Sequence, residues 1–321
     1  MSEAILSVVV PCYNEQEVLP ETSRRLEALL RGLIDEGKIG ARSRIWFVDD
    51  GSRDCTWSMI QESSMAKDSL VCGIKLSRNR GHQAALMAGL MTATGDVMIS
   101  VDADLQDDLD AIPKMLNEYR AGCDIVYGVR SSRSSDSFFK RFTAEGYYTL
   151  LQRLGIEVIF NHADYRLMSR RAVEALRAFP ETSLFLRALV PQLGFRSAQV
   201  EYARSERFAG ESKYPLGKML ALAWQGVTSF TAAPLRAITA LGMLVSLFSL
   251  GMGFWAFWVR IFSDQALPGW ASIVIPLFLL SGVQLLSLGV IGEYVAKLFM
   301  ETKRRPIYLI EQISQAPERQ D

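Results

Sequence analysis

Charged residues are nearly absent from one long stretch of this 321-residue chain. Between residues 237 and 292 only Arg260 and Asp264 carry a charge, whereas elsewhere about one residue in four is charged, as in soluble domains. A single uniform globule is therefore excluded, and so is a carrier with most of its mass in lipid. The 35 basic residues balance the 35 acidic ones. This balance argues against a nucleic-acid-binding protein, because such proteins normally carry a basic excess.

Residues typical of metal centres, disulfides and nucleotide-binding loops are also scarce. Only His82 and His162 are present, which nearly excludes a metal centre built from histidine. The four cysteines form no Cys-x-x-Cys pair, so reduced thiols of a cytosolic domain fit better than a zinc site or a disulfide framework. The chain has neither a Gly-x-Gly-x-x-Gly motif nor a P-loop. Any bound phosphate must therefore be held by a metal ion and side chains.

Short β-rich runs alternate with helical patterns over the first 130 residues. Continuous apolar strands separated by helices indicate an α/β fold with a mostly parallel sheet that is covered on both faces. Such sheets bind ligands at the carboxyl ends of their strands, and the polar clusters of this sequence follow those ends. Strands are predicted at 6–10, 44–49, 71–76, 96–102 and 124–129, and helices near 15–33, 54–66, 82–94 and 111–121.

Two hydrophobic segments follow, at 237–259 and 271–292, and each is long enough to cross about 30 Å of hydrocarbon. Arg236 precedes the first segment, and a basic group that includes Arg304 and Arg305 follows the second. Because positively charged flanks stay in the cytoplasm, we expect a multi-pass protein of a cell inner membrane. Its large domain and both termini would lie in the cytoplasm.

These patterns divide the chain into four predicted parts. They are a cytoplasmic α/β domain at 1–210, a polar loop with an interfacial helix at 211–235, a transmembrane hairpin at 236–300 and a cytoplasmic tail at 301–321. Amphipathic patterns at 139–154 and 216–230 allow two interpretations, because an apolar helix face packs on a protein core or lies in a membrane interface.

An acidic run from 102 to 108 directly follows the fourth predicted strand. Asp102 and Asp104 place two carboxylates across a tight turn, and Gln106 adds a neutral oxygen. This set suits a hard divalent cation, Mg²⁺ or Mn²⁺, because Mg²⁺ takes one or two protein carboxylates and fills its shell with phosphate oxygens and water. The alternative is a solvated acidic turn whose aspartates cap the next helix. The position at a strand end favours the metal site.

Polar residues also follow the first two strands. An acid such as Asp50, just after a second strand, often accepts hydrogen bonds from a ribose or base. Its alternative role is the N-cap of the next helix, which Asp54 fills equally well. Pro11, Tyr13 and Glu15 end the first strand, where the tyrosine ring has a place to stack on a base.

Two basic groups are candidates for binding phosphate. Arg130 ends the fifth predicted strand and Arg141 follows in a Ser/Arg-rich region, while Arg207 and Lys213 lie in the loop RFAGESKY before the second amphipathic pattern. The alternative is a positive surface attracted to anionic lipid. Both interpretations hold together if the substrate is itself a lipid phosphate.

Six motifs occur in a characteristic order: VVVPCYNE, FVDDGS, NRGHQAAL, VDADLQDD, DYRL and RFAGESKY. In this order the chain resembles the polyprenyl-phosphate group of glycosyltransferase family 2, from residue 6 to about residue 305. That group includes dolichyl-phosphate mannosyltransferases and bacterial undecaprenyl-phosphate glucosyl- and aminoarabinosyl-transferases. The resemblance implies a GT-A fold, a nucleotide-sugar donor and a polyprenyl phosphate acceptor in the membrane. The Gln-x-x-Arg-Trp signature of processive synthases is missing, which argues against polymerisation.

The resemblance also implies roles for the residues at matching positions. The nucleoside pocket would consist of Pro11, Tyr13, Glu15 and Asp50. The metal ion on the donor diphosphate would be held by Asp102, Asp104 and Gln106. The acceptor phosphate would be bound by Arg130 and Arg141, and the donor diphosphate would be contacted by Arg207 and Lys213. Asp164 matches a family acid near the sugar, and we expect it to orient the sugar or an arginine rather than to remove a proton.

The expected reaction is the metal-dependent, inverting transfer of a glucose-like sugar from a UDP-sugar to undecaprenyl phosphate, for modification of a cell-envelope glycan. Four alternatives remain open: dolichyl-phosphate mannose synthesis from GDP-mannose, transfer to a soluble acceptor, sugar nucleotidyl transfer, and a non-catalytic membrane-anchored nucleotide-binding protein. Small residues such as Gly251 and Gly289 permit close helix contacts, which suit either a homo-oligomer or packing within one hairpin.

Overall fold

The computed structural model describes residues 3–131, 162–179, 186–203, 233–262 and 270–315. The chain forms two units. The first comprises residues 1–152, 157–214 and 305–321, and the second comprises residues 153–156 and 215–304.

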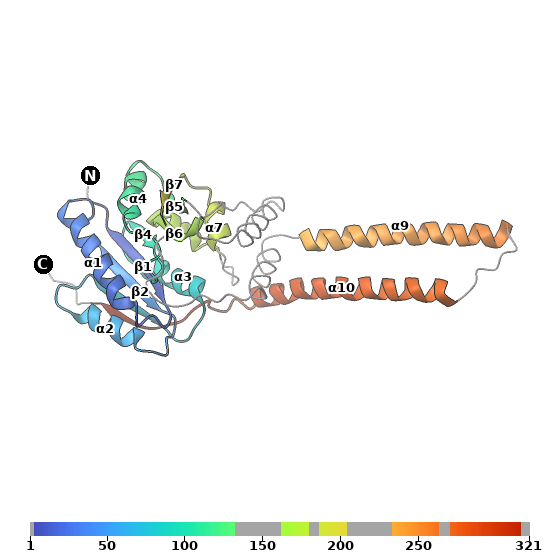
Figure 1. Cartoon of the computed structure of the whole chain (residues 1–321), viewed down its shortest axis with the longest axis horizontal. Helices are drawn as coiled ribbons and strands as arrows, with labels where there is room; N and C mark the ends of the chain where they lie inside the picture. The colour runs from blue at the N-terminus through green and yellow to red at the C-terminus, as the bar shows by residue number, and fades with distance from the viewer. Residues whose placement is uncertain (1–2, 132–161, 180–185, 204–232, 263–269, 316–321) are drawn as a thin grey trace. The chain divides into compact units, whose positions relative to one another are not determined.

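The first unit is built on an eight-stranded mixed sheet with the order β7-β5-β6-β4-β1-β2-β3-β8 (Figure 1). Neighbours run parallel except where β6 meets β4 and β5 and where β8 meets β3. The prediction of an α/β fold with a mostly parallel sheet is therefore confirmed. The strands are β1 (Leu6–Cys12), β2 (Arg44–Asp49), β3 (Val71–Leu76), β4 (Val97–Ser100), β5 (Ile125–Arg130), β6 (His162–Ser169), β7 (Ser197–Tyr202) and β8 (Ile310–Gln315).

Helices cover both faces of this sheet. On one face, Leu26 of α1, Ile60 of α2 and Met115 of α4 share a single core with alternate residues of β1. On the other face α3 lies so close that a Cβ at Gly89 would come within 2.3 Å of the Val9 side chain. The helices of this unit are α1 (Leu19–Asp35), α2 (Thr56–Met65), α3 (His82–Thr92), α4 (Ala111–Arg120), α6 (Arg170–Leu176) and α7 (Leu186–Gln192).

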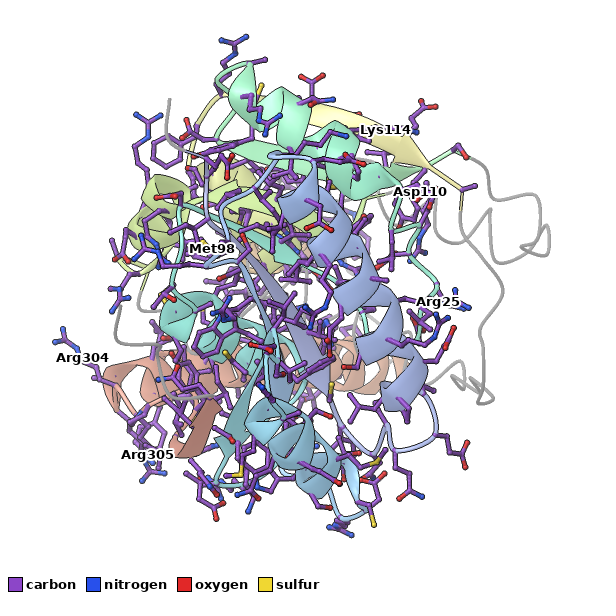
Figure 2. All side chains as sticks on the ribbon, turned by 90° about the vertical axis from the view of Figure 1, so that its left-hand side faces the viewer. Arg25, Met98, Asp110, Lys114, Arg304 and Arg305 are labelled. Carbon is purple, nitrogen blue, oxygen red and sulfur yellow. The ribbon has the colours of Figure 1, made fainter. Side chains whose placement is uncertain are left out.

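The periodicity of the helices explains this packing. In α1 the buried positions Leu19, Leu26, Leu30 and Leu33 recur every three to four residues, so one apolar stripe faces the sheet. Figure 2 shows the helix sides that face away from the sheet, where Arg25 of α1 and Lys114 of α4 point outward. Met98 of β4, by contrast, is buried in the interior of the unit.

Three strands were not predicted from the sequence. β6 and β7 extend the sheet beyond β4, and β8 forms its other edge. β8 is held by antiparallel pairing with β3 and by a buried 2.6 Å hydrogen bond between the hydroxyls of Ser64 and Ser314. Residues 301–321, predicted to be a tail, thus contribute an edge strand to the sheet.

The second unit contains two long helices, α9 (Ala233–Phe262) and α10 (Trp270–Thr302), which run side by side in opposite directions (Figure 1). The predicted spans at 237–259 and 271–292 fall inside them. Among the side chains described, one stretch, Leu280–Thr302, is long and apolar enough to cross a membrane, with a mean hydropathy of 1.4 and no buried part. The two-span hairpin itself stays a prediction.

Several predictions concern residues outside the described ranges. The amphipathic patterns at 139–154 and 216–230 lie there, and so do Arg141, Arg207 and Lys213. Their predicted roles therefore stay predictions.

Candidate active site

The carboxyl end of β2 is tied to the segment that leads into α3. The Asp50 carboxylate accepts hydrogen bonds from the backbone amides of Arg80 at 2.7 Å and Gly81 at 2.8 Å. Burial raises the pKa of Asp50. Asp54, not Asp50, bonds an amide at the start of α2, that of Thr56 at 3.0 Å. Asp50 is therefore part of the polar end of the sheet rather than a helix cap.

The segment after β1 turns sharply beside a hollow. β1 is longer than predicted, so Pro11 is buried within it, opposite Val48. Asn14 has a left-handed backbone, with φ of 55°, and its side-chain oxygen accepts the Arg53 amide at 2.8 Å. A cavity of about 440 Å³ is lined by residues 14–18, 53 and 54. Of the predicted nucleoside-pocket residues only Glu15 lines this cavity, while Tyr13 is 39% exposed.

The acidic run after β4 is a tight, well-anchored turn. Leu105 has a left-handed backbone, with φ of 56°, and Asp104 Oδ1 accepts the Gln106 amide at 3.2 Å. A non-glycine residue in this region is uncommon and is found preferentially at functional sites. Because α4 begins only after Asp110, Asp102 and Asp104 do not cap it. The helix-capping alternative for these two carboxylates is therefore excluded.

Three hydroxyl groups from three different elements hold the 102–108 segment. Thr22 of α1 donates to the Ala103 carbonyl at 2.8 Å, and Tyr165 of β6 donates to the Asp108 carbonyl at 2.9 Å. Tyr202 of β7 donates to Asp107 Oδ1 at 2.7 Å. Hydrogen bonds of these lengths are well formed, so the segment is fixed to helix α1 and to strands β6 and β7.

The donor set of this turn fits a cation that is shared with a ligand. Among the described residues no three His, Cys, Asp or Glu side chains gather into a ready-made metal site. Asp102, with a side chain that is 37% exposed, and Asp104 supply two carboxylates from one turn. Since Mg²⁺ usually takes only one or two protein carboxylates and completes its shell with phosphate and water, this set fits a metal–diphosphate rather than a resident metal.

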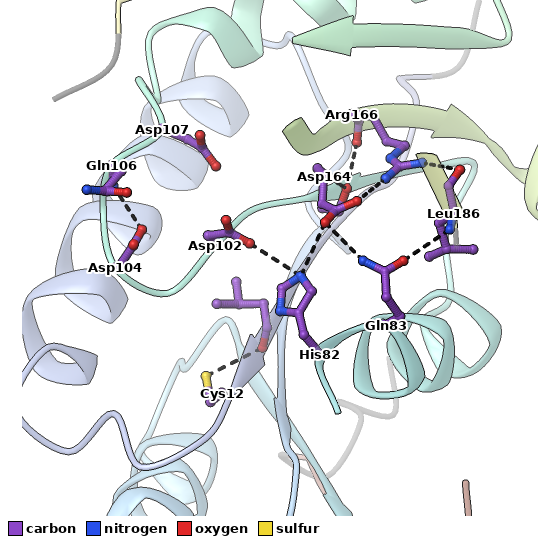
Figure 3. Close-up of polar contacts among 12 residues, drawn as sticks. Cys12, His82, Gln83, Asp102, Asp104, Gln106, Asp107, Asp164, Arg166 and Leu186 are labelled. Carbon is purple, nitrogen blue, oxygen red and sulfur yellow. Dashed lines mark hydrogen bonds and ion pairs between the residues drawn. The ribbon is translucent and has the colours of Figure 1, made fainter. Parts of the chain in front are cut away.

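His82, the first residue of α3, lies between two carboxylates (Figure 3). Its Nε2 atom is 3.5 Å from Asp102 Oδ1 and 3.7 Å from Asp164 Oδ2. Both distances exceed those of normal hydrogen bonds. His82 therefore lies between the acidic turn and Asp164 of β6 without a short hydrogen bond to either carboxylate.

Asp164 is the most heavily partnered carboxylate of the site. It accepts from Arg166 at 2.5 Å and from the Gln83 side chain at 2.9 Å (Figure 3). It also accepts from Arg187 of α7 at 3.2 Å. Burial alone would raise the pKa of Asp164, but Arg187 and Arg166 outweigh it and hold this pKa below its ordinary value. A carboxylate that is buried, ionised and paired in this way is poorly suited to remove a proton.

Arg130 is connected to the acidic turn through Tyr202. Arg130 Nε donates to the Tyr202 hydroxyl at 3.3 Å, and that hydroxyl donates to Asp107. Burial, with Asp102 nearby, raises the pKa of Asp107 to about 6. The predicted phosphate-binding arginine and the predicted metal-binding turn therefore belong to one hydrogen-bonded group.

The residues of this site that the sequence reasoning missed include His82, Gln83, Arg187 and Tyr202. A signal existed for the first two, because they lie within the motif NRGHQAAL. Arg187 and Tyr202 lie outside every motif and reach the site only through the tertiary fold.

Comparison with known proteins places the chain in a family. The model of glycosyl transferase family 2 matches residues 7–177. A Bacillus subtilis (strain 168) protein named "Uncharacterized glycosyltransferase YkoT" is 50% identical over 97% of this chain and 92% of its own length. The "Bactoprenol glucosyl transferase" of Shigella phage SfX is 39% identical over 95% of this chain and 98% of its own.

Among solved structures, glucosyl-3-phosphoglycerate synthase from Mycobacterium tuberculosis, in complex with Mn²⁺, UDP and phosphoglyceric acid, is 19% identical. It matches 70% of this chain and 76% of its own with a TM-score of 0.46. The family match, together with the mixed sheet, makes the first unit a GT-A type α/β fold. The protein is a glycosyltransferase, and the chain belongs to glycosyltransferase family 2.

Proposed function

We propose that this protein transfers a glucose-like sugar from a UDP-sugar to a membrane polyprenyl phosphate, for which undecaprenyl phosphate is the test acceptor. The observation that carries the proposal is the likeness to the bactoprenol glucosyl transferase of Shigella phage SfX, which extends over 95% of this chain. The alignment therefore includes the long apolar helices as well as most of the sheet. A soluble acceptor would not require such helices.

In the proposed reaction an oxygen of the acceptor phosphate attacks the anomeric carbon of the sugar. The bond from that carbon to the donor diphosphate breaks as the new bond forms, so the configuration inverts and the nucleoside diphosphate leaves. A phosphate monoester has a second pKa of about 6, so the nucleophile is mostly dianionic at cytosolic pH and no base is needed. This suits Asp164, whose lowered pKa and arginine partners favour an orienting role.

The main obstacle to this reaction is electrostatic, because a dianion must approach a diphosphate. Asp102, Asp104 and Gln106 are proposed to hold Mg²⁺ or Mn²⁺ there, and a bound divalent cation neutralises charge on the leaving diphosphate. Arg130, with Arg141, is proposed to bind the acceptor phosphate. Asp50, Pro11, Tyr13 and Glu15 are proposed to surround the nucleoside, and Arg207 and Lys213 to contact the diphosphate.

The apolar helices α9 and α10 are proposed to anchor the enzyme in a bacterial inner membrane as a hairpin, with the large domain and both termini in the cytoplasm. This arrangement would keep the site near the surface where the phosphate of the lipid is found. The length and apolar character of Leu280–Thr302 support at least one crossing.

The donor is tested with full-length protein in detergent, undecaprenyl phosphate as acceptor and a panel of UDP- and GDP-sugars. We expect UDP-glucose to give lipid-linked sugar at the highest kcat/KM. A higher kcat/KM with GDP-mannose, particularly with dolichyl phosphate, would favour the mannose-type alternative. Lipid-linked sugar from none of the donors would contradict the proposal.

Changing Arg130 to lysine is expected to raise the KM for the lipid acceptor about tenfold, because lysine cannot reproduce the bidentate geometry of an arginine on a phosphate. The KM for the donor should change much less. Steady-state kinetics with each substrate varied in turn measure both values. Arg171→Lys, in an exposed ion pair with Asp124, serves as the control. Equal effects of Arg130→Lys on both substrates would argue against its acceptor role.

A further inference from the structure

We propose that Tyr202 is a positioning residue that sets the place of Arg130 relative to the acidic turn, and thereby the separation of acceptor phosphate and donor diphosphate. The inference rests on the proposed function, in which Arg130 binds the acceptor. It concerns a residue that lies outside every motif of the sequence and about 95 positions from its partner Asp107.

The hydroxyl group of Tyr202 uses both of its hydrogen-bonding capacities in the site. It has a single hydrogen atom, which it donates to Asp107 Oδ1 at 2.7 Å. Its oxygen accepts from Arg130 Nε at 3.3 Å. Replacing this hydroxyl group by hydrogen therefore removes both the bond to Asp107 and the bond from Arg130.

The backbone and ring of Tyr202 are fixed independently of these bonds. Parallel pairing of β5 with β7 places Tyr202 directly beside Arg130, and the Ser131 amide donates to the Tyr202 carbonyl at 3.0 Å. The ring is 3% exposed and packs edge-on against Tyr165, with centroids 5.1 Å apart. Because the ring stays anchored in this way, Tyr202→Phe should remove the hydroxyl group without displacing the residue.

Of the three hydroxyls that hold the acidic segment, only that of Tyr202 also has a described hydrogen bond to Arg130, the arginine proposed to bind the acceptor. Thr22 bonds the Ala103 carbonyl and Tyr165 bonds the Asp108 carbonyl, and neither has a described bond to Arg130. If Tyr202 merely stabilised the turn, its loss would resemble the loss of either of the others. If it positions Arg130, its loss should act through the arginine.

The chain thus offers three matched, nearly isosteric hydroxyl deletions: Thr22→Val, Tyr165→Phe and Tyr202→Phe. Each is made alone and together with Arg130→Lys in full-length protein, and assayed with UDP-glucose and undecaprenyl phosphate. Tyr202→Phe alone should raise the acceptor KM about tenfold, as for one charge-assisted hydrogen bond, with a smaller change in donor KM. In the Arg130→Lys background the effect of Tyr202→Phe should be largely lost, because the two changes break the same link.

The two other deletions should combine with Arg130→Lys additively. Thermal unfolding of the same variants without substrate gives a second cycle that does not depend on activity, and it should again couple Tyr202 to Arg130 but not Thr22 to Arg130. Additive behaviour of Tyr202→Phe and Arg130→Lys in both cycles would overturn the inference while leaving the proposed function intact. A wild-type protein that transfers no sugar to polyprenyl phosphate would instead overturn the proposed function, and with it the acceptor role given to this link.

Discussion

Substituting Asp104 with alanine is expected to lower kcat about 100- to 1,000-fold at saturating metal and donor, the usual cost of losing a group that stabilises developing charge. Asp104 lies on the turn that follows β4, where Leu105 is held in a left-handed conformation and Asp104 Oδ1 bonds the Gln106 amide. In our account this carboxylate holds the cation that neutralises the leaving diphosphate. Kinetics across a titration of Mg²⁺ and Mn²⁺ measure the effect.

Asp110→Ala provides the matched control for Asp104→Ala. It removes the same charge from the same connection, but Asp110 is exposed and precedes α4 without a side-chain capping bond. Its kcat should stay close to that of the wild type. If Asp104→Ala retained activity within a few-fold of the wild type at saturating metal, the assignment of the metal site would be wrong.

Substituting Asp164 with alanine is expected to lower the free energy of unfolding by about 3–5 kcal/mol, because it leaves a buried charge without its partner. That charge is Arg166, which is 2% exposed and bonded to Asp164 at 2.5 Å. Arg187 and the side chain of Gln83 lose a partner at the same time. Denaturant unfolding of the variant, compared with the wild type in the same detergent, gives the value.

The pH dependence of this difference has a definite sign. Because the pKa of Asp164 is lowered by its arginines, its stabilising effect is present above the ordinary aspartate pKa of about 3.9 and is lost only as the pH falls below it. The gap between wild type and Asp164→Ala should therefore be constant from about pH 5 to 8. Glu311→Ala, which breaks an exposed pair with Lys75, should change stability little. A gap that narrowed steadily with rising pH in this range would mean that Asp164 titrates there in the folded protein.

A further substitution separates stability from catalysis at the same position. Asp164→Asn keeps the size of the side chain and one acceptor oxygen, so the variant should fold more stably than Asp164→Ala. If Asp164 only orients neighbouring groups, the rate of this variant should fall at low pH with the same apparent pKa as the rate of the wild type. That apparent pKa should lie near the second pKa of the acceptor phosphate, about 6. Loss of this fall in rate at low pH would indicate that Asp164 is a base.

The central part of the sheet could be predicted because its strands are buried on both faces. All seven residues of β1 are buried, and the runs that became β2 and β3 are almost equally apolar. Continuous apolar runs between helical patterns are a strong signal. β6 gave no such signal, since its buried pair Asp164 and Arg166 interrupts the apolar pattern.

The edge strand β8 was missed for a different reason. Five of its six residues are exposed, and it is held by backbone pairing with β3 rather than by an apolar face. Only the Ser314 hydroxyl is buried, against Ser64 some 250 positions earlier. No local property of residues 310–315 indicates a strand, because this strand forms by pairing with β3, which is far away in the sequence.

The candidate site likewise contains residues that the sequence indicates and residues that only the fold brings together. Asp50, Asp102 and Arg130 were found because polar residues that directly follow apolar strands must meet at one edge of a parallel sheet. Arg187 and Tyr202 come from α7 and β7, whose arrangement depends on the whole fold. Their contacts with Asp164 and Asp107 join residues 23 and 95 positions apart, so only the structure brings them into the site.

The most direct test of the account is the partition of radiolabelled sugar from UDP-glucose into the organic phase. Purified full-length protein is incubated with undecaprenyl phosphate and Mg²⁺ or Mn²⁺, with EDTA, or with a water-soluble phosphate acceptor such as 3-phosphoglycerate. We predict that label enters the lipid fraction only when undecaprenyl phosphate and metal are both present, and that Asp104→Ala abolishes most of it. Label that appears in lipid without metal, or only on the water-soluble acceptor, would contradict the account.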